Sequence, residues 1–102
     1  MKLCLSLFLL LAATVASAQQ ASDAKAVYTK NCAICHGPDG RAQVPAGKSI
    51  KAADLTSDAV QKQTDAQLRD ALARGKGKMP AYGPALGPKG LDTMVKYIRT
   101  LK

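Results

Sequence analysis

Aromatic side chains, histidine and cysteine are scarce in this chain of 102 residues, which contains no Trp, one Phe, three Tyr, one His and three Cys. A structural zinc site usually takes four Cys or His ligands from two separated clusters, and this chain has only one such cluster. The shortage of large aromatic side chains also limits the core that so small a domain can build by itself. We therefore expect something other than side chains to supply part of the core.

The chain also has no apolar run long enough to cross a bilayer, which takes about 20 residues. Its longest apolar run extends only from Leu3 to Val15. This run follows Lys2 and is followed by the small residues 16–18 (Ala-Ser-Ala). A charged start, an apolar centre and an A-x-A cleavage site are typical of a secretory signal peptide. The sequence predicts a signal peptide over 1–18 and one domain over 19–102, with an uncleaved membrane anchor as the alternative.

Two of the cysteines, Cys32 and Cys35, are followed directly by the single histidine, His36. The pattern C-x-x-C-H is the signature of covalent c-type haem attachment. The two thiols are spaced to add to the vinyl groups of one porphyrin, and the adjacent imidazole is placed to ligate its iron. A thioredoxin-like C-x-x-C would instead follow a buried strand, whereas residues 22–28 have a helical pattern. The motif therefore predicts one haem c.

A methionine in the second half of the chain has no packing explanation. Met79 lies between Gly75 and Gly83 in a stretch rich in Gly and Pro, which neither a helix nor a strand explains. Its thioether is therefore free to be the second axial ligand. Met94 serves as an internal control, because it lies on a stripe of helical spacing over residues 91–101 and is expected in the core.

Three helices are indicated by capping signals and apolar spacing. The first begins with Ser22 as N-cap and continues into the haem motif. The second begins at residues 64–67 (Thr-Asp-Ala-Gln), which form a capping box, and ends at Gly75. The third follows Pro88 and Gly90 and runs from residue 91 to the end. The long stretch between residues 37 and 64 is expected to be a loop along one edge of the porphyrin.

The haem motif and Met79 together resemble the small monohaem class I c-type cytochromes, over essentially the whole of residues 19–102. Other features that carry the resemblance are Tyr28, Gly37, Gly40, residues 54–56 (Asp-Leu-Thr) and residues 96–101 (Lys-Tyr-Ile-Arg-Thr-Leu). The resemblance implies an all-α fold, with three main helices wrapped around one covalently bound haem. It also implies a soluble electron carrier whose iron cycles between Fe(II) and Fe(III).

Several residues are expected around the haem. His36 and Met79 are the expected iron ligands. In similar proteins a proline carbonyl shortly after the motif accepts the second N–H of the ligating histidine, and Pro45 is the candidate here. Leu68 and Leu72 lie four apart in the second helix and should face the haem, and Leu55 is expected beside them.

Function follows from this coordination. With His36 and Met79 both bound, no position is open for substrate at the iron, so we expect an electron carrier and not an enzyme. Asp39, Asp54 and Asp92 have the sequence positions of turn or helix-end residues, and no acid–base pair is evident. A small peroxidase, a gas sensor, or a subunit dedicated to one complex remain the alternatives.

The chain is basic, with 15 Lys and Arg against 7 Asp and Glu, and a net charge of +8. An exported protein has no use for nucleic-acid binding, so we expect a periplasmic protein that docks as a monomer on redox proteins. A membrane oxidase, reductase or reaction centre with an acidic patch would fit. The alternative is that the basic residues only maintain solubility. The candidate docking residues are Lys48, Lys51, Arg74, Lys76, Lys78 and Lys89.

The thin core leads to a test. Replacing both haem-attaching thiols, in Cys32→Ala/Cys35→Ala, is expected to leave a largely unfolded chain, because the haem supplies much of the core. Far-ultraviolet circular dichroism of the haem-free protein measures this directly. Native helicity without haem would contradict the expectation.

Overall fold

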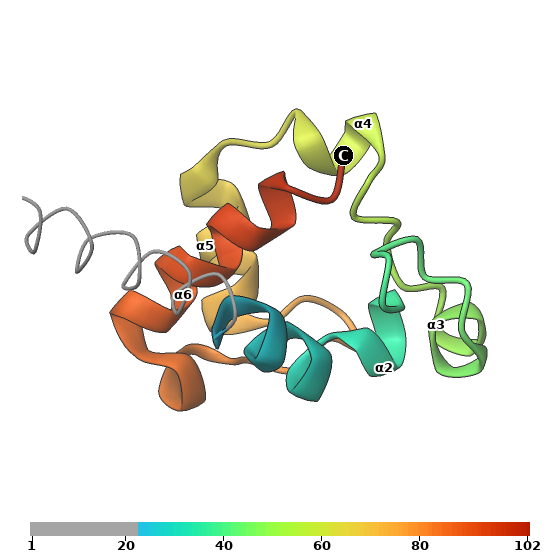
Figure 1. Ribbon diagram of the computed structural model, residues 1–102, viewed down its shortest axis with the longest axis horizontal. Helices are drawn as coiled ribbons and strands as arrows, with labels where there is room; N and C mark the ends of the chain where they lie inside the picture. Colours follow the sequence, from blue (N-terminus) through green and yellow to red (C-terminus); the bar gives the residue numbers. More distant parts are fainter. Residues whose placement is uncertain (1–22) are drawn as a thin grey trace, which may run out of the picture.

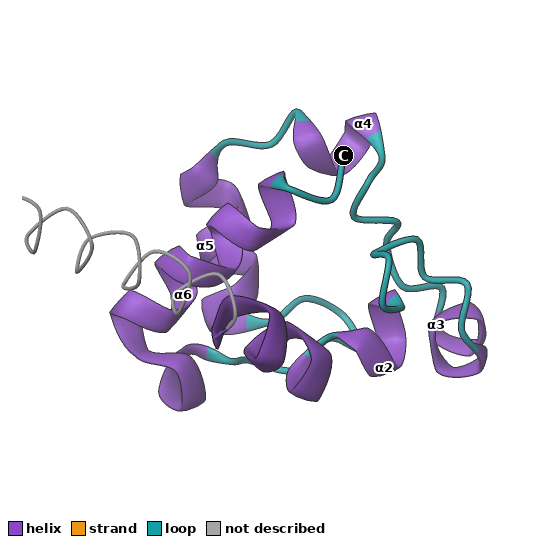
Figure 2. Ribbon diagram, viewed as in Figure 1, coloured by secondary structure: helices purple, strands orange, loops and turns teal. Residues whose placement is uncertain are grey.

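The computed structural model describes residues 23–102 (Figure 1). These residues form helices joined by loops, and this part of the chain contains no strand (Figure 2). After a helical stretch over residues 23–31, the elements in chain order are α2 (Ala33–His36), α3 (Pro45–Ile50), α4 (Asp58–Gln61), α5 (Asp65–Arg74) and α6 (Gly83–Arg99). The predicted all-α class is confirmed.

The first and second predicted helices lie where the sequence indicates. The helix over residues 23–31 leads into the haem motif, and the Cys32 N–H still donates to the Tyr28 carbonyl (2.8 Å). Its predicted N-cap, Ser22, lies outside the described residues. The capping box of α5 is formed in full, since the Thr64 hydroxyl accepts from the Gln67 N–H while the Gln67 side chain accepts from the Thr64 N–H. Gly75 ends α5 at a positive φ of 76°.

The third predicted helix begins earlier than expected. Gly87 interrupts α6 with a φ of 66°, and the regular C-terminal part begins directly after it at Pro88 instead of at Leu91. Proline suits the first turn of a helix, because its fixed φ is helical and its missing N–H needs no partner there. The sequence analysis also missed α3 and α4, which are six and four residues long, too short to show a helical period.

Two pairs of helices pack together. Figure 1 shows α5 beside α6, while α3 stands at the opposite end of the molecule next to α2. The short α4 is tied to the end of α6 by polar contacts. Gln61 donates to the carbonyls of Leu55 (2.7 Å) and Ile98 (3.0 Å), and Arg99 donates back to the Gln61 carbonyl (2.8 Å). These bonds connect the middle of the chain to its C-terminal helix.

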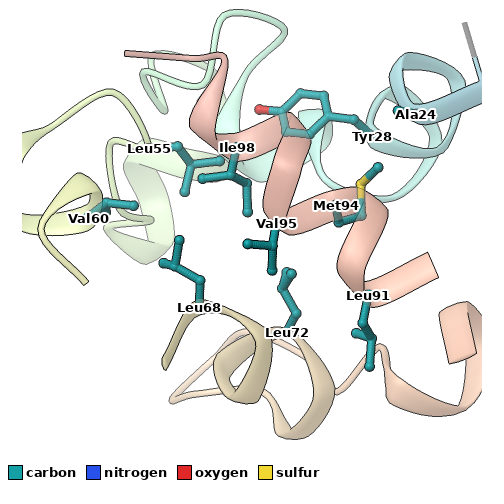
Figure 3. Close-up of a cluster of buried hydrophobic side chains, with 10 residues drawn as sticks. All are labelled: Ala24, Tyr28, Leu55, Val60, Leu68, Leu72, Leu91, Met94, Val95 and Ile98. Carbon is teal, nitrogen blue, oxygen red and sulfur yellow. The ribbon is translucent and has the colours of Figure 1, made fainter. Parts of the chain in front are cut away.

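The core lies between the helix over residues 23–31, α5 and α6 (Figure 3). Tyr28 and Met94 are its most buried side chains, each 1% exposed. The Tyr28 ring lies 4.8 Å from the Tyr97 ring, centroid to centroid. The core positions predicted for Tyr28 and Met94 are confirmed, and Tyr97 is half-buried and packs against the core. The cluster consists of Ala24, Tyr28, Leu55, Val60, Leu68, Leu72, Leu91, Met94, Val95 and Ile98.

The predicted signal peptide, residues 1–18, lies outside the described residues. Within residues 23–102, none of the helices has both the length and the apolar character needed to cross a membrane.

The Tyr28 hydroxyl provides a test of the core. It donates to the Gly37 carbonyl at 2.6 Å, and burial of the ring raises the pKa of this hydroxyl, which keeps it a donor. Tyr28→Phe removes this bond, although the Gly37 carbonyl still accepts from the Gly40 N–H at 3.2 Å. The loss of one hydrogen bond should lower the free energy of unfolding of the haem-loaded protein by about 0.5–1.5 kcal/mol. Urea denaturation measures the change.

Tyr97→Phe is the matched control, because the Tyr97 hydroxyl makes no hydrogen bond within residues 23–102. An equal loss of stability in both variants would show that the Tyr28 hydrogen bond has no special role.

Candidate haem site

The haem motif forms a single helical turn. The N–H groups of Cys35 and His36 both donate to the Cys32 carbonyl, at 3.2 and 2.9 Å. Gly37 follows with a φ of 79°, which ends the turn. This turn brings Cys32, Cys35 and His36 to the wall of the same cavity, whereas Ile34 faces away and is 70% exposed. The helical geometry thus separates the three chemical groups from the one exposed apolar side chain.

Two adjoining cavities lie beside this turn. The larger has a volume of about 640 Å³ and is walled on its inner side by core residues that include Leu55, Leu68 and Leu72. The smaller cavity has a volume of about 320 Å³ and is lined in part by the loop that carries Met79. Both cavities are lined by Cys32, His36, Ala53, Lys76 and Met79.

The cysteine thiols are free and half-buried. Burial, and then the neighbouring Cys35, raise the pKa of the Cys32 thiol to about 11. The Cys32 thiol of the haem-free chain is therefore neutral at physiological pH. No group of three or more His, Cys, Asp or Glu side chains among residues 23–102 is arranged to hold a metal ion.

His36 is oriented by a carbonyl that the sequence analysis did not predict. Its Nδ1 lies 2.9 Å from the Ala53 carbonyl oxygen. Because a carbonyl only accepts, Nδ1 carries the hydrogen, and Nε2 keeps a lone pair for a metal. The prediction that the Pro45 carbonyl accepts this hydrogen bond is wrong. Pro45 is the first residue of α3 and lines neither cavity, and a carbonyl at that position belongs to the hydrogen-bond ladder of its own helix.

The segment around Ala53 is fixed on both sides. On one side Gly47 of α3 packs directly on the haem motif, since a Cβ there would lie 2.0 Å from the Cys35 carbonyl oxygen. On the other side the Leu55 N–H donates to the Gly40 carbonyl (2.7 Å). The Asp54 carboxylate accepts from the Thr56 hydroxyl (2.6 Å), and this bond and the Thr56 N–H lower the pKa of Asp54.

Met79 is held in a tight turn. It exchanges two backbone hydrogen bonds with Lys76, at 3.0 and 3.1 Å. A Cβ on Gly75 would lie 2.5 Å from the Met79 carbonyl oxygen, so only glycine allows this close approach. Met79 is half-buried and lines both cavities, whereas Met94 is buried in the core and lines only the larger one. The structure thus separates the two methionines as the sequence predicts.

The site has the chemistry and the shape that a haem needs. Two thiols, an imidazole with a free Nε2 and a thioether converge on cavities whose inner wall is leucine-rich. A flat apolar cofactor bound at two cysteines would complete the wall formed by Leu55, Leu68 and Leu72. The residues present therefore fit a haem c. Tyr82 also lines the smaller cavity. Sequence reasoning missed Ala53, Gly47 and Tyr82, because none of them belongs to a recognisable motif.

Comparison with known proteins agrees with this geometry. The family described as cytochrome c oxidase, cbb3-type, subunit III matches residues 19–98. The chain belongs to this family. It is also 31% identical to cytochrome c6 of Gloeothece citriformis, covering 81% of this chain and 73% of the relative. Identity to cytochrome c6 of Microcystis aeruginosa is 29%, covering 74% of this chain and 90% of the relative.

A further relative is larger than this chain. The chain is 30% identical to the cbb3-type cytochrome c oxidase subunit FixP of Azorhizobium caulinodans over 74% of its length, but spans only 25% of that subunit. Among solved structures, the KustC0563 c-type cytochrome matches with a TM-score of 0.70 and 24% identity, over 76% of this chain and 95% of that chain. This likeness shows the cytochrome c fold.

Family membership establishes the cofactor and its general role. The chain is a small monohaem class I cytochrome c, with haem c bound covalently through Cys32 and Cys35. Its function is one-electron transfer through this haem, as a carrier that acts with other redox proteins. The predicted family, fold, cofactor and electron-carrier function are confirmed.

Proposed function

We propose that this cytochrome is a non-enzymatic carrier whose iron is held by His36 and Met79. One observation carries the proposal: both residues line both cavities beside the attachment cysteines. When bound, the haem supplies an iron that gains and loses one electron. His36 presents Nε2, because the Ala53 carbonyl occupies the other ring nitrogen, and Met79 presents its sulfur from a constrained turn. Two side-chain ligands leave no open position for a substrate.

The axial methionine is tested by Met79→Ala in the haem-loaded protein. The ferric wild type should show a sulfur-to-iron absorption band in the near infrared that the variant lacks. Reduced wild type should bind carbon monoxide slowly, and the reduced variant should bind it at least about tenfold faster, because the sixth position is then open. Absorption spectroscopy and stopped-flow mixing measure both quantities.

Met94→Leu is the matched control. Met94 lines the larger cavity but is buried in the core, and a Leu of similar volume fills the same space and should preserve both signals. A high-spin ferric spectrum, or rapid carbon monoxide binding by the wild type, would contradict Met79 ligation and favour a peroxidase or a gas sensor.

A basic rim at the smaller cavity supports docking on an acidic surface. Lys51, Lys76 and Lys78 line this cavity, beside the attachment cysteines. Of the other candidates, Arg74 pairs with Asp70 at 2.9 Å, and Lys48, Arg74 and Lys89 line neither cavity. We therefore assign the docking face to Lys51, Lys76 and Lys78. The partner proposed is a membrane oxidase, reductase or reaction centre with an acidic patch.

The family match also favours a second arrangement, in which the chain serves a cbb3-type oxidase as a dedicated subunit. FixP proteins are described as subunits of such an oxidase, and this chain is similar to about a quarter of one. Co-purification with a membrane oxidase distinguishes this arrangement from a freely diffusing monomer.

The proposed location is the periplasm, after cleavage behind residue 18. The N-terminal signal pattern supports this location, and the family match begins at residue 19. The N-terminal residue of the purified protein, read by mass spectrometry, tests the cleavage site.

The basic rim leads to a kinetic prediction. Lys76→Gln/Lys78→Gln should slow oxidation of the ferrous protein by ferricyanide, a small trianion, by roughly threefold at low ionic strength. The difference should shrink as salt is added, because salt screens the attraction. Stopped-flow absorption at several ionic strengths measures the rates.

Lys96→Gln/Lys102→Gln removes the same charge from exposed residues that line neither cavity. If both double variants slow the reaction equally, net charge alone acts and the basic residues only maintain solubility.

A further inference from the structure

Tyr82 connects three separate parts of the molecule. Its N–H donates to the Leu72 carbonyl in α5 at 2.8 Å, and its own carbonyl accepts from the Leu86 N–H in α6 at 2.9 Å. Its hydroxyl donates to the Asn31 carbonyl at 3.1 Å. Figure 2 shows the loop between α5 and α6 running past the helix of residues 23–31. Tyr82 lies on this loop, three residues after Met79.

Two of these bonds complete helix ends. The last four carbonyls of a helix have no partner within the helix. Leu72 lies in the last turn of α5, and Asn31 is the last residue of the helix over residues 23–31. In a continuous helix the Asn31 carbonyl would accept from the Cys35 N–H, but this N–H donates to the Cys32 carbonyl instead. The Tyr82 hydroxyl therefore supplies the hydrogen-bond donor that the Asn31 carbonyl lacks, at the end of the helix that leads into the haem motif.

The position of Asn31 gives this bond its importance. Asn31 directly precedes Cys32, and both residues line the smaller cavity together with Met79 and Tyr82. The two hydrogen bonds that shape the Met79 turn run only between Lys76 and Met79, within the loop itself. Tyr82 supplies the side-chain hydrogen bond that joins this loop to the segment that holds the haem.

We propose that Tyr82 is a positioning residue whose hydroxyl latches the Met79 loop against the haem-attachment segment and thereby limits how often Met79 leaves the iron. The inference rests on the proposed function, since it requires Met79 as a ligand. Partial burial raises the pKa of the Tyr82 hydroxyl, so it stays protonated as a donor. Without the hydroxyl, the loop keeps its turn but loses this link to Asn31.

Tyr82→Phe tests the latch, because it keeps the ring and removes only the hydroxyl. The ferric, haem-loaded protein is titrated with imidazole, which competes with Met79 for the iron, and loss of the sulfur-to-iron band is followed. The variant should bind imidazole roughly three- to tenfold more tightly than the wild type, the effect expected from the loss of one hydrogen bond. The Met79 amide should also exchange its hydrogen faster, while the Val95 amide in α6 should be unaffected.

Tyr97→Phe is the matched control. Tyr97 is half-buried like Tyr82, but it lines neither cavity, so its imidazole affinity should equal that of the wild type. An imidazole affinity of Tyr82→Phe within about 1.5-fold of the wild type would overturn the latch, even if urea denaturation showed a loss of global stability. Equal gains in affinity for both variants would overturn it as well.

Failure of the latch is distinguishable from failure of the proposed function. A wild type that shows the sulfur-to-iron band and an unchanged variant would overturn only the latch. A wild type without this band would overturn Met79 ligation and the latch together.

Discussion

The structure depends on one constraint: its small core must form the wall of an open cavity of about 640 Å³. Leu55, Leu68, Leu72, Met94 and Ile98 belong to the core cluster and also form the wall of this cavity. Protein interiors are normally close-packed, because unfilled volume costs free energy. Covalently bound haem c supplies the missing contacts. The same side chains therefore hold the helices together and line the haem site, so we expect folding to be coupled to haem attachment.

Backbone carbonyls, more than charged side chains, give this cavity its geometry. The Gly37 carbonyl fixes Tyr28, the Ala53 carbonyl orients His36, and the Asn31 carbonyl receives Tyr82. The partners lie nine, seventeen and fifty-one residues apart in the chain, and each bond places a residue on or next to the cavity wall. A carbonyl is present at every residue, so such contacts require only the correct backbone path. The close approach of Gly47 to Cys35 helps to fix this path.

The two methionines show how the same side chain acquires two roles. Met94 lies on the apolar stripe of α6 and is 1% exposed, so it contributes packing. Met79 lies in a turn between Gly75 and Pro80, where the backbone leaves its thioether at both cavities. Lys76 and Lys78 precede it in the chain and also line the smaller cavity. One short loop thus combines the proposed iron ligand with the positive charge proposed to attract a partner.

The sequence by itself determined the cofactor, the capping box of α5 and the core position of Met94, because these depend on neighbouring residues and helical spacing, and the resemblance to class I cytochromes c implied the all-α class. The tertiary structure decided the start of the last helix at Pro88, the presence of α3 and α4, and the partner of His36. Ala53 lies seventeen residues from His36 and Tyr82 lies fifty-one from Asn31. Such pairings follow from the complete backbone path, and no local pattern encodes them.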